Sequence, residues 1–132
     1  MGLHPTTPAV LALDVGGSSL KGAVVPADGH PVHVGRRDSD ADGDALTAIV
    51  GFLRELHDVA RAHDLDVVGA GVVTPGMLDE ATGTVRYASN FDWHDLPLRT
   101  LLTEATGLPV TTGRPVASVS SCLLYTSDAA DE

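Results

Sequence analysis

Residues 14–21 read DVGGSSLK and are bounded on both sides by apolar runs. The run before them, Ala9 to Leu13, is too short for a helix of ordinary length and predicts a buried strand. The run after them, Leu20 to Val25, is apolar apart from Lys21 and ends in proline and glycine, which are typical of turns. Because two adjacent glycines allow the backbone to turn tightly, we expect the two runs to form an antiparallel hairpin.

The same segment has the composition of a phosphate-binding turn. Glycines let backbone N–H groups approach a phosphate, and Ser18 and Lys21 can add a hydroxyl donor and a positive charge. Asp14 can hold a magnesium ion through water, since this cation prefers oxygen ligands. The alternative is that Gly16 and Gly17 only form a hairpin turn, with the lysine solvated and the aspartate accepting from a turn amide. The segment is neither a Walker loop nor a dinucleotide fingerprint, because no GxxxxGK run occurs and no helix is expected after the glycines.

Two kinds of periodicity follow the hairpin. Residues 32–35 alternate valine with histidine and glycine, which predicts a third strand beside the second. Residues 37–44 are polar and rich in aspartate, as in a surface loop. In residues 45–63 apolar side chains recur at spacings of three and four, so they line one face of a helix. We expect Asp44 to cap this helix by accepting backbone N–H groups.

The second half of the chain continues the alternation of predicted strands and helices. Residues 67–73 predict a buried strand that ends at Thr74, where we expect a loop to begin. Residues 97–106 predict a short helix with proline in its first turn and Gly107 as the residue that stops it. Residues 108–112 predict the next strand. This order of elements indicates a mixed α/β domain with a central sheet.

Composition excludes several classes of partner. The chain has 132 residues, enough for one domain, and 43% of them are apolar. Eight basic residues against 18 acidic ones give a net charge of −10, which opposes binding to nucleic acid or to an anionic membrane. Cys122 is the one cysteine, so the chain holds no internal disulfide and no zinc cluster. No segment approaches the roughly 20 apolar residues that a membrane helix needs, and we expect a cytoplasmic protein.

Two further segments narrow the family. Residues 69–79 read GAGVVTPGMLD, and residues 88–93 read ASNFDW. Together with the turn at residues 14–21, they resemble, in order and spacing, the ROK family of bacterial sugar kinases and sugar-responsive repressors. The turn itself resembles the first phosphate motif of the actin, Hsp70 and sugar-kinase superfamily, with Ser18 in place of the usual threonine. The resemblance implies a truncated N-terminal ROK kinase domain over residues 9–113, of ribonuclease-H-like (actin-like ATPase) fold, with a mixed central sheet and flanking helices.

The resemblance also implies an activity. It makes the parent protein a glucokinase-like, homodimeric enzyme that phosphorylates a hexose with ATP and magnesium. It puts five residues of the turn at the ATP phosphates and their magnesium ion: Asp14, Gly16, Gly17, Ser18 and Lys21.

On the sugar side the resemblance places Pro75, Gly76 and Asn90. An asparagine amide both donates and accepts, which suits a sugar hydroxyl, and a glycine lets the backbone approach a ring closely. The alternative makes Asn90 a turn residue. For Trp93 we favour a role as a packing anchor in the core.

The family pattern ends near Gly113. Family members continue to an Asn-Asp or His-Asp pair whose aspartate is the general base, and here that position is Pro115, which cannot accept a proton. Residues 122–132 fit no part of the family and resemble a reading frame through a DNA-library adapter. We therefore expect residues 114–132 to be a non-native, artefactual tail and the fragment to be inactive.

Two other classes of function stay open. One is a sugar-responsive repressor of the same family, whose DNA-binding helix-turn-helix would precede the phosphate turn. The chain begins about eight residues before the first expected strand, and this favours the kinase. The other is a non-catalytic nucleotide-binding module related to actin or Hsp70, against which the segments at residues 69–79 and 88–93 argue.

Overall fold

The computed structural model describes residues 7–39, 44–74, 76–88 and 91–113. Its centre is a five-stranded sheet in the order β3-β2-β1-β4-β8. Strand β2 is antiparallel to both of its neighbours, β1 and β3, whereas β4 pairs in parallel with β1 and β8 pairs in parallel with β4. The expected mixed central sheet of an α/β domain is therefore confirmed. The strand bounds are β1 (Thr7–Val15), β2 (Ser19–Pro26), β3 (His33–Asp38), β4 (Leu65–Val73) and β8 (Val110–Gly113).

The expected hairpin forms at residues 14–21, the candidate phosphate turn. Strand β1 pairs with β2 along its length, and Val15 lies opposite Leu20 at the closed end. Residues 16–18 are the connection between the two strands, and no helix follows them. The short turn follows from the two glycines between apolar runs. Burial along β1 alternates, with Val10 41% exposed, although its continuous apolar run predicted a buried strand.

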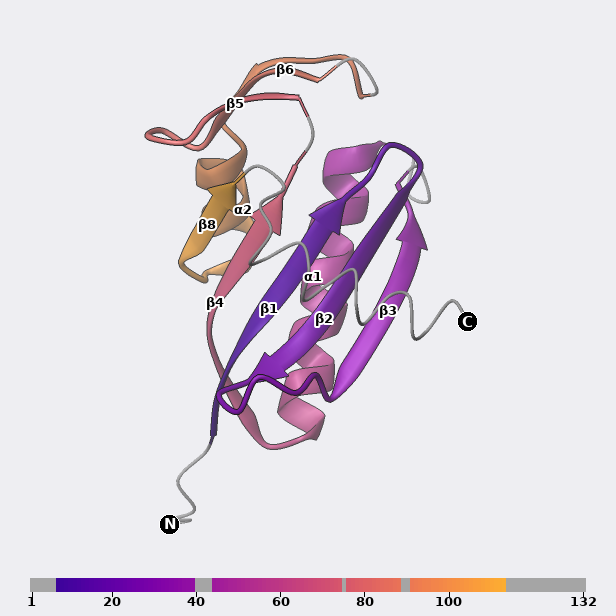
Figure 1. The fold of residues 1–132 in the computed structure, drawn as a ribbon, viewed down its shortest axis with the longest axis vertical. Helices are drawn as coiled ribbons and strands as arrows, with labels where there is room; N and C mark the ends of the chain where they lie inside the picture. The colour runs from indigo at the N-terminus through magenta and orange to yellow at the C-terminus, as the bar shows by residue number, and fades with distance from the viewer. Residues whose placement is uncertain (1–6, 40–43, 75, 89–90, 114–132) are drawn as a thin grey trace.

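Helix α1 (Ala45–Ala62) covers one face of the central sheet (Figure 1). As expected, Asp44 is its N-cap, since the carboxylate accepts from the Thr47 backbone amide at 2.9 Å and from the Thr47 hydroxyl at 2.8 Å. The core forms where the apolar stripe of the helix meets the sheet, and burying each large side chain there contributes roughly 1.5–3 kcal/mol. Fully buried members include Leu11, Leu13, Leu20, Val24, Ile49, Leu53 and Leu56.

Helix α2 (Leu98–Thr106) confirms the second expected helix. Pro97 precedes it and Gly107 ends it, with the Gly107 amide donating to the Thr103 carbonyl at 2.9 Å. The guanidinium of Arg54 on α1 donates to the Ala105 carbonyl at 3.0 Å, so the two helices are joined at the end of α2. Neither helix in the described residues is long and apolar enough to cross a membrane.

Strand β3 extends further than the sequence predicted. Arg37 and Asp38, which we expected in a surface loop, belong to the strand and pair with Leu20 and Ser19 of β2. A polar edge strand gives no apolar alternation, so its end cannot be recognised from the sequence.

A second sheet was missed. Three short strands, β5 (Met77–Asp79), β6 (Thr84–Ala88) and β7 (Trp93–Leu96), form an antiparallel sheet in the region that we expected to begin as a loop. This small sheet lies beyond the end of the central sheet at which β1 and β4 finish (Figure 1). Residues 69–79 and 88–93, the two segments that resemble the ROK family, contribute to this sheet, because the first ends in β5 and the second ends at the first residue of β7.

Candidate functional site

Three parallel strands end at the same edge of the central sheet. Asp14 of β1 lies beside Val73 of β4, which in turn lies beside Gly113 of β8. The Thr74 amide donates to the Gly113 carbonyl at 3.1 Å, so the chain leaves β4 in contact with the end of β8. Ligands of open α/β sheets bind beyond the carboxyl ends of their strands, and this edge is therefore the candidate site.

The turn between β1 and β2 is closed by its own backbone. The Gly16 amide donates to the Ser19 carbonyl at 2.9 Å. A Cβ atom at Gly16 would lie 2.9 Å from that carbonyl oxygen, which is closer than real Cβ atoms approach. Glycine is thus required at position 16 by the tightness of the turn.

The turn is also fastened to the residue that follows β3. The Ser39 amide donates to the Ser18 carbonyl at 3.1 Å, and the Ser39 hydroxyl donates to the Gly17 carbonyl at 3.3 Å. Ser39 is buried, with 6% of its surface exposed. Sequence reasoning missed Ser39, because one serine in an aspartate-rich segment carries no signal of its own.

Asp14 and Lys21 stand together beside the turn. They are direct partners in the β1–β2 pair, and both are half-buried. They lie on the face of the sheet opposite α1, because Gly22, the residue after Lys21, faces α1: a Cβ atom there would lie 2.7 Å from the Leu56 side chain. Partial burial raises the pKa of Asp14, and the positive charge of Lys21 offsets part of that rise. The arrangement gives one carboxylate and one ammonium group next to a turn whose glycines keep the backbone open.

This donor set fits magnesium bound together with a nucleotide. Within the described ranges, no three side chains of the His, Cys, Asp or Glu type gather closely enough to enclose a metal ion. Magnesium in nucleotide sites needs no such cage, because it keeps several waters and is held by one or two carboxylates plus phosphate oxygens. A half-buried carboxylate that burial destabilises in its charged form suits that role, and Asp14 is such a group.

Gly76 begins the small sheet in a backbone conformation that favours glycine. Its φ is +92°, and an added Cβ atom would lie 2.3 Å from the Tyr87 carbonyl oxygen on β6. With Met77, Leu78, Asp79 and Arg86, Gly76 lines an open surface pocket. Pro75 and Asn90, the other two predicted sugar-side residues, lie outside the described residues, as does Pro115.

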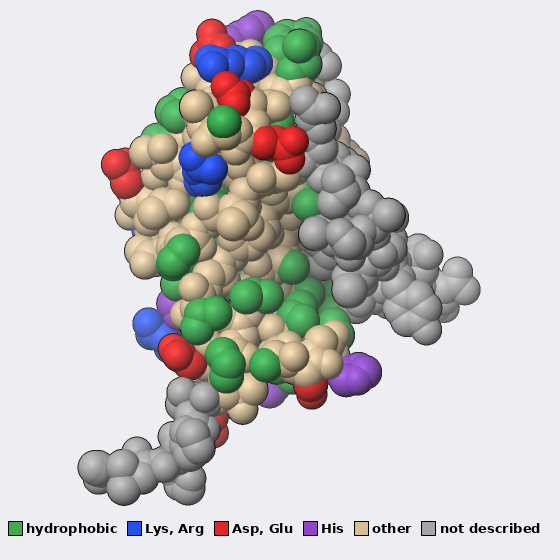
Figure 2. Space-filling view, turned by 60° about the vertical axis from the view of Figure 1, so that its left-hand side comes forward, with side chains coloured by type: hydrophobic (Ala, Val, Ile, Leu, Met, Phe, Trp, Pro, Cys, Tyr) green, Lys and Arg blue, Asp and Glu red, His purple; other side chains and the backbone are tan. Residues whose placement is uncertain are grey.

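Two arginines tie the small sheet together. Arg86 of β6 donates to Asp79 of β5 at 3.1 Å and to Asp95 of β7 at 3.2 Å, and the Arg86 hydrogen bond lowers the pKa of Asp79. Figure 2 shows acidic and basic side chains side by side at the end of the molecule that carries this sheet. Exposed ion pairs of this kind contribute little to stability.

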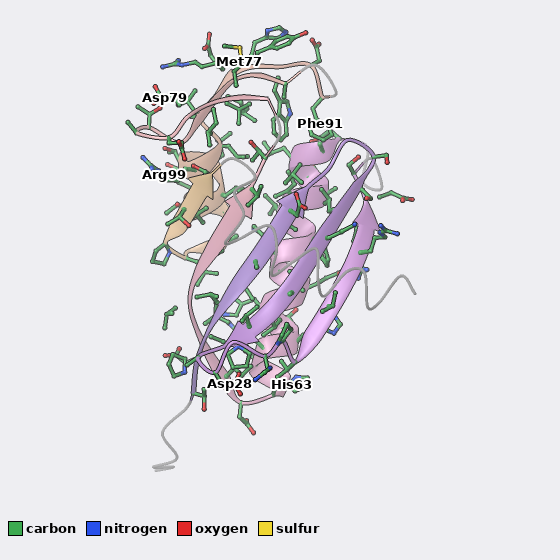
Figure 3. The ribbon with its side chains drawn as sticks, viewed as in Figure 1. Asp28, His63, Met77, Asp79, Phe91 and Arg99 are labelled. Atoms are coloured by element: carbon green, nitrogen blue, oxygen red, sulfur yellow. The ribbon has the colours of Figure 1, made fainter. Side chains whose placement is uncertain are left out.

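The second arginine, Arg99, reaches from α2 to the turn between β5 and β6. Its guanidinium donates to the Ala81 carbonyl at 3.0 Å, and its backbone amide donates to the Gly83 carbonyl at 3.1 Å. Figure 3 shows Arg99 and Asp79 near the same end of the small sheet. Helix α2 therefore braces the hairpin that begins at the predicted sugar loop.

Trp93 is a packing residue, as predicted. It is 8% exposed and belongs to the buried core. Its ring lies 4.8 Å from the ring of Phe91, measured between centroids, at a tilt of 42°. Such tilted aromatic pairs contribute about 0.5–1.5 kcal/mol beyond their buried area.

Comparisons with known proteins agree on one family. The sequence profile of the ROK family matches residues 10–123. A glucokinase of Halalkalibacterium halodurans is 33% identical over 103 residues, which are 76% of this chain and 31% of that protein. A xylose repressor of Caldicellulosiruptor bescii is 36% identical over 44 residues, 33% of this chain and 11% of that protein.

Among solved structures, a ROK family glucokinase from Streptomyces griseus in complex with glucose and AMPPNP matches with a TM-score of 0.68 and 25% identity. The match covers 80% of this chain and 33% of that one. The chain thus spans about a third of the length of the glucokinases that it matches. Its fold is that of an actin-like ATPase domain with a mixed central sheet, as expected. By sequence and by fold, this chain belongs to the ROK family.

Proposed function

We propose that the intact protein transfers the terminal phosphoryl group of ATP to a hexose, as a glucokinase does. The observation that carries this proposal is the turn at residues 16–18, which has the half-buried Asp14 before it on β1 and the cross-strand partner Lys21 after it on β2. The identity to glucokinases over three quarters of the chain supports the same activity.

On the nucleotide side, the proposal assigns the ATP phosphates to the turn. The backbone of Gly16, Gly17 and Ser18 would lie against the phosphates. The Gly16 amide closes the turn by donating to the Ser19 carbonyl, so the N–H groups of Gly17 and Ser18 would bind phosphate oxygens, with the Ser18 hydroxyl as a further donor. Lys21 would add positive charge, and Asp14 would hold the hydrated magnesium ion. The magnesium ion would neutralise charge on the phosphates, and the residues of the turn would hold the nucleotide in position.

On the sugar side, the proposal assigns Pro75, Gly76 and Asn90 to the hexose. The backbone of Gly76 carries no side chain between itself and a ring, and the Asn90 amide can both donate to and accept from one hydroxyl. In the reaction, the hydroxyl oxygen of the hexose forms a bond to the terminal phosphorus, and the bond from that phosphorus to the bridging oxygen breaks. The products are the sugar phosphate and ADP, and the hydroxyl proton passes to a general base.

The general base is the part that this chain does not supply. By the resemblance, Pro115 occupies the position of the catalytic aspartate, and we propose that residues 114–132 are a non-native tail, although the ROK profile match extends to residue 123. Loss of a general base alone typically costs a factor of about 10² to 10⁴ in rate. We therefore propose that the 132-residue chain itself does not phosphorylate sugars.

The second candidate is a sugar-responsive repressor, which the identity to a xylose repressor supports. The two candidates differ in one measurable respect, because only the kinase turns over ATP. A coupled ADP-release assay on the intact protein, with a panel of hexoses and pentoses, separates them. Hexose-dependent release of ADP supports the kinase, whereas sugar binding without turnover supports the repressor.

A further inference from the structure

Ser39 makes two hydrogen bonds to consecutive peptide groups of the turn. Its hydroxyl donates to the Gly17 carbonyl at 3.3 Å, and its amide donates to the Ser18 carbonyl at 3.1 Å. Ser39 directly follows β3, which pairs with β2 and not with β1. The carbonyl groups of Gly17 and Ser18 are thus drawn toward the β3 side.

Because the peptide bond is planar, the direction of each carbonyl group also fixes the direction of the N–H group of the next residue. In a trans peptide, the C=O of one residue and the N–H of the next point in opposite directions. The Gly17 carbonyl shares its peptide with the Ser18 amide, and the Ser18 carbonyl shares its peptide with the Ser19 amide. Because Ser39 draws both carbonyls toward β3, the N–H groups of Ser18 and Ser19 point away from β3.

We propose that Ser39 is a positioning residue for the phosphate turn: it orients the Ser18 and Ser19 amides toward the bound phosphates. This inference rests on the proposed function, because it needs the turn to bind a nucleotide. Ser39 touches no ligand itself and acts through the Gly17 and Ser18 peptides. Such a fixed pair of donors binds an anion without first losing backbone freedom, which is the advantage of preorganisation.

The hydroxyl and the amide of Ser39 act on different peptides, and this makes the inference testable. Ser39→Ala removes the bond to the Gly17 carbonyl and frees the peptide that carries the Ser18 amide. It leaves the bond from the Ser39 amide to the Ser18 carbonyl, so the Ser19 amide stays oriented. A purely structural role would instead perturb the neighbourhood of Ser39 and the stability without singling out the Ser18 amide.

The experiment is a titration of the ¹⁵N-labelled chain with magnesium ATP, followed through the backbone amide resonances of the turn. We expect Ser39→Ala to weaken binding by a factor of about 2 to 10, the usual effect of one neutral hydrogen bond. The shift induced at the Ser18 amide should fall more than the shift at the Ser19 amide. Ser39→Thr, which keeps the hydroxyl, should restore both values.

Thr106→Val is the matched control. The Thr106 hydroxyl also makes two hydrogen bonds to backbone, donating to the Leu102 carbonyl at 2.7 Å and accepting from the Leu108 amide at 3.2 Å, but it lies at the end of α2. Its removal should lower the melting temperature and leave the titration unchanged.

Magnesium ATP could shift the Ser18 amide resonance equally in the parent chain and in Ser39→Ala. That result would overturn the inference about Ser39, while the assignment of the turn to the phosphates would still stand. Equal weakening by Thr106→Val would also overturn it, because the effect would then reflect stability alone. A parent chain whose residues 16–19 show no response, or whose spectrum lacks dispersion, would remove the phosphate turn of the proposed function together with the inference.

Discussion

Lys21 lies directly opposite Asp14 in the β1–β2 pair, and its charge favours the ionised form of a carboxylate that partial burial disfavours. Burial is the larger of the two effects, so the pKa of Asp14 stays above its ordinary value. The negative charge of the Asp14 carboxylate is therefore not fully compensated by its surroundings. A cation bound there would supply the missing compensation.

The first prediction concerns this pair. Lys21→Met removes the positive charge and keeps an apolar side chain of similar length, so the pKa of Asp14 should rise further. Lys21→Arg keeps the charge and should leave the pKa close to that of the parent chain. A ¹³C NMR titration of the Asp14 carboxyl group measures both. A fall in the pKa of Asp14 in Lys21→Met would contradict the assigned interaction.

The second prediction concerns stability against pH. Folding raises the pKa of Asp14, so the folded chain holds this proton more tightly than the unfolded chain. The stability that this provides is fully present below the unfolded pKa and is lost as the pH rises through the folded pKa. Asp14→Asn is always neutral and should unfold with a higher free energy at pH 7, by about 1 kcal/mol or less once solvent screening is allowed for.

The same substitution should weaken magnesium ATP binding, so stability and binding move in opposite directions. Urea unfolding measures the free energy of unfolding of the parent chain and of Asp14→Asn at two pH values, pH 7 and a pH below the ordinary pKa of aspartate. The difference between the two proteins should vanish at the lower pH. Lower stability of Asp14→Asn at pH 7 would mean that the carboxylate is structural.

The third prediction compares two glycines with similar positive φ. Gly76 has φ +92° and no room for a Cβ atom, whereas Gly29 has φ +83° and nothing within 4 Å of the Cβ position. Gly29→Ala should cost about 1 kcal/mol from backbone strain alone. Gly76→Ala should cost clearly more, about 2–4 kcal/mol, because the Tyr87 carbonyl must also move. Equal losses in urea unfolding would show that the close approach to β6 is absent.

Much of the fold was predictable because its signals are local. The glycine pair between two apolar runs predicted the β1–β2 hairpin, and the spacing of apolar residues predicted α1 to within one residue of its end. Asp44 was recognisable as a cap because an aspartate before an apolar helix pattern accepts the first free amides.

The small sheet was not predictable for a physical reason. Asp92 and Asp95 have positive φ values of 56° and 50°, and Asp95 lies inside β7, so the alternation of side chains along that strand is broken. The three strands are also only 3 to 5 residues long. Ser39 was missed because its role depends on β3 lying beside the turn, which is a tertiary relationship.

The fourth prediction is that the chain of 132 residues has no sugar kinase activity. Pro115 cannot accept the proton of the sugar hydroxyl, and the chain has about a third of the length of the glucokinases that it matches. A coupled ADP-release assay with a panel of hexoses should give the rate of the blank without protein. Hexose-dependent turnover above that blank would contradict the assignment of residues 114–132 to a non-native tail.

The measurement that tests the central claim most directly is hexose-dependent ADP release by the intact protein and by its Asp14→Ala variant, with hexose binding measured alongside by calorimetry. If the turn at residues 14–21 binds the phosphates of ATP, the intact protein turns over and Asp14→Ala loses turnover. Hexose binding should then be unchanged, because the sugar side of the site is intact. Asp14→Ala with full turnover, or with hexose binding lost in the same proportion as turnover, would contradict the assignment of this turn to the nucleotide.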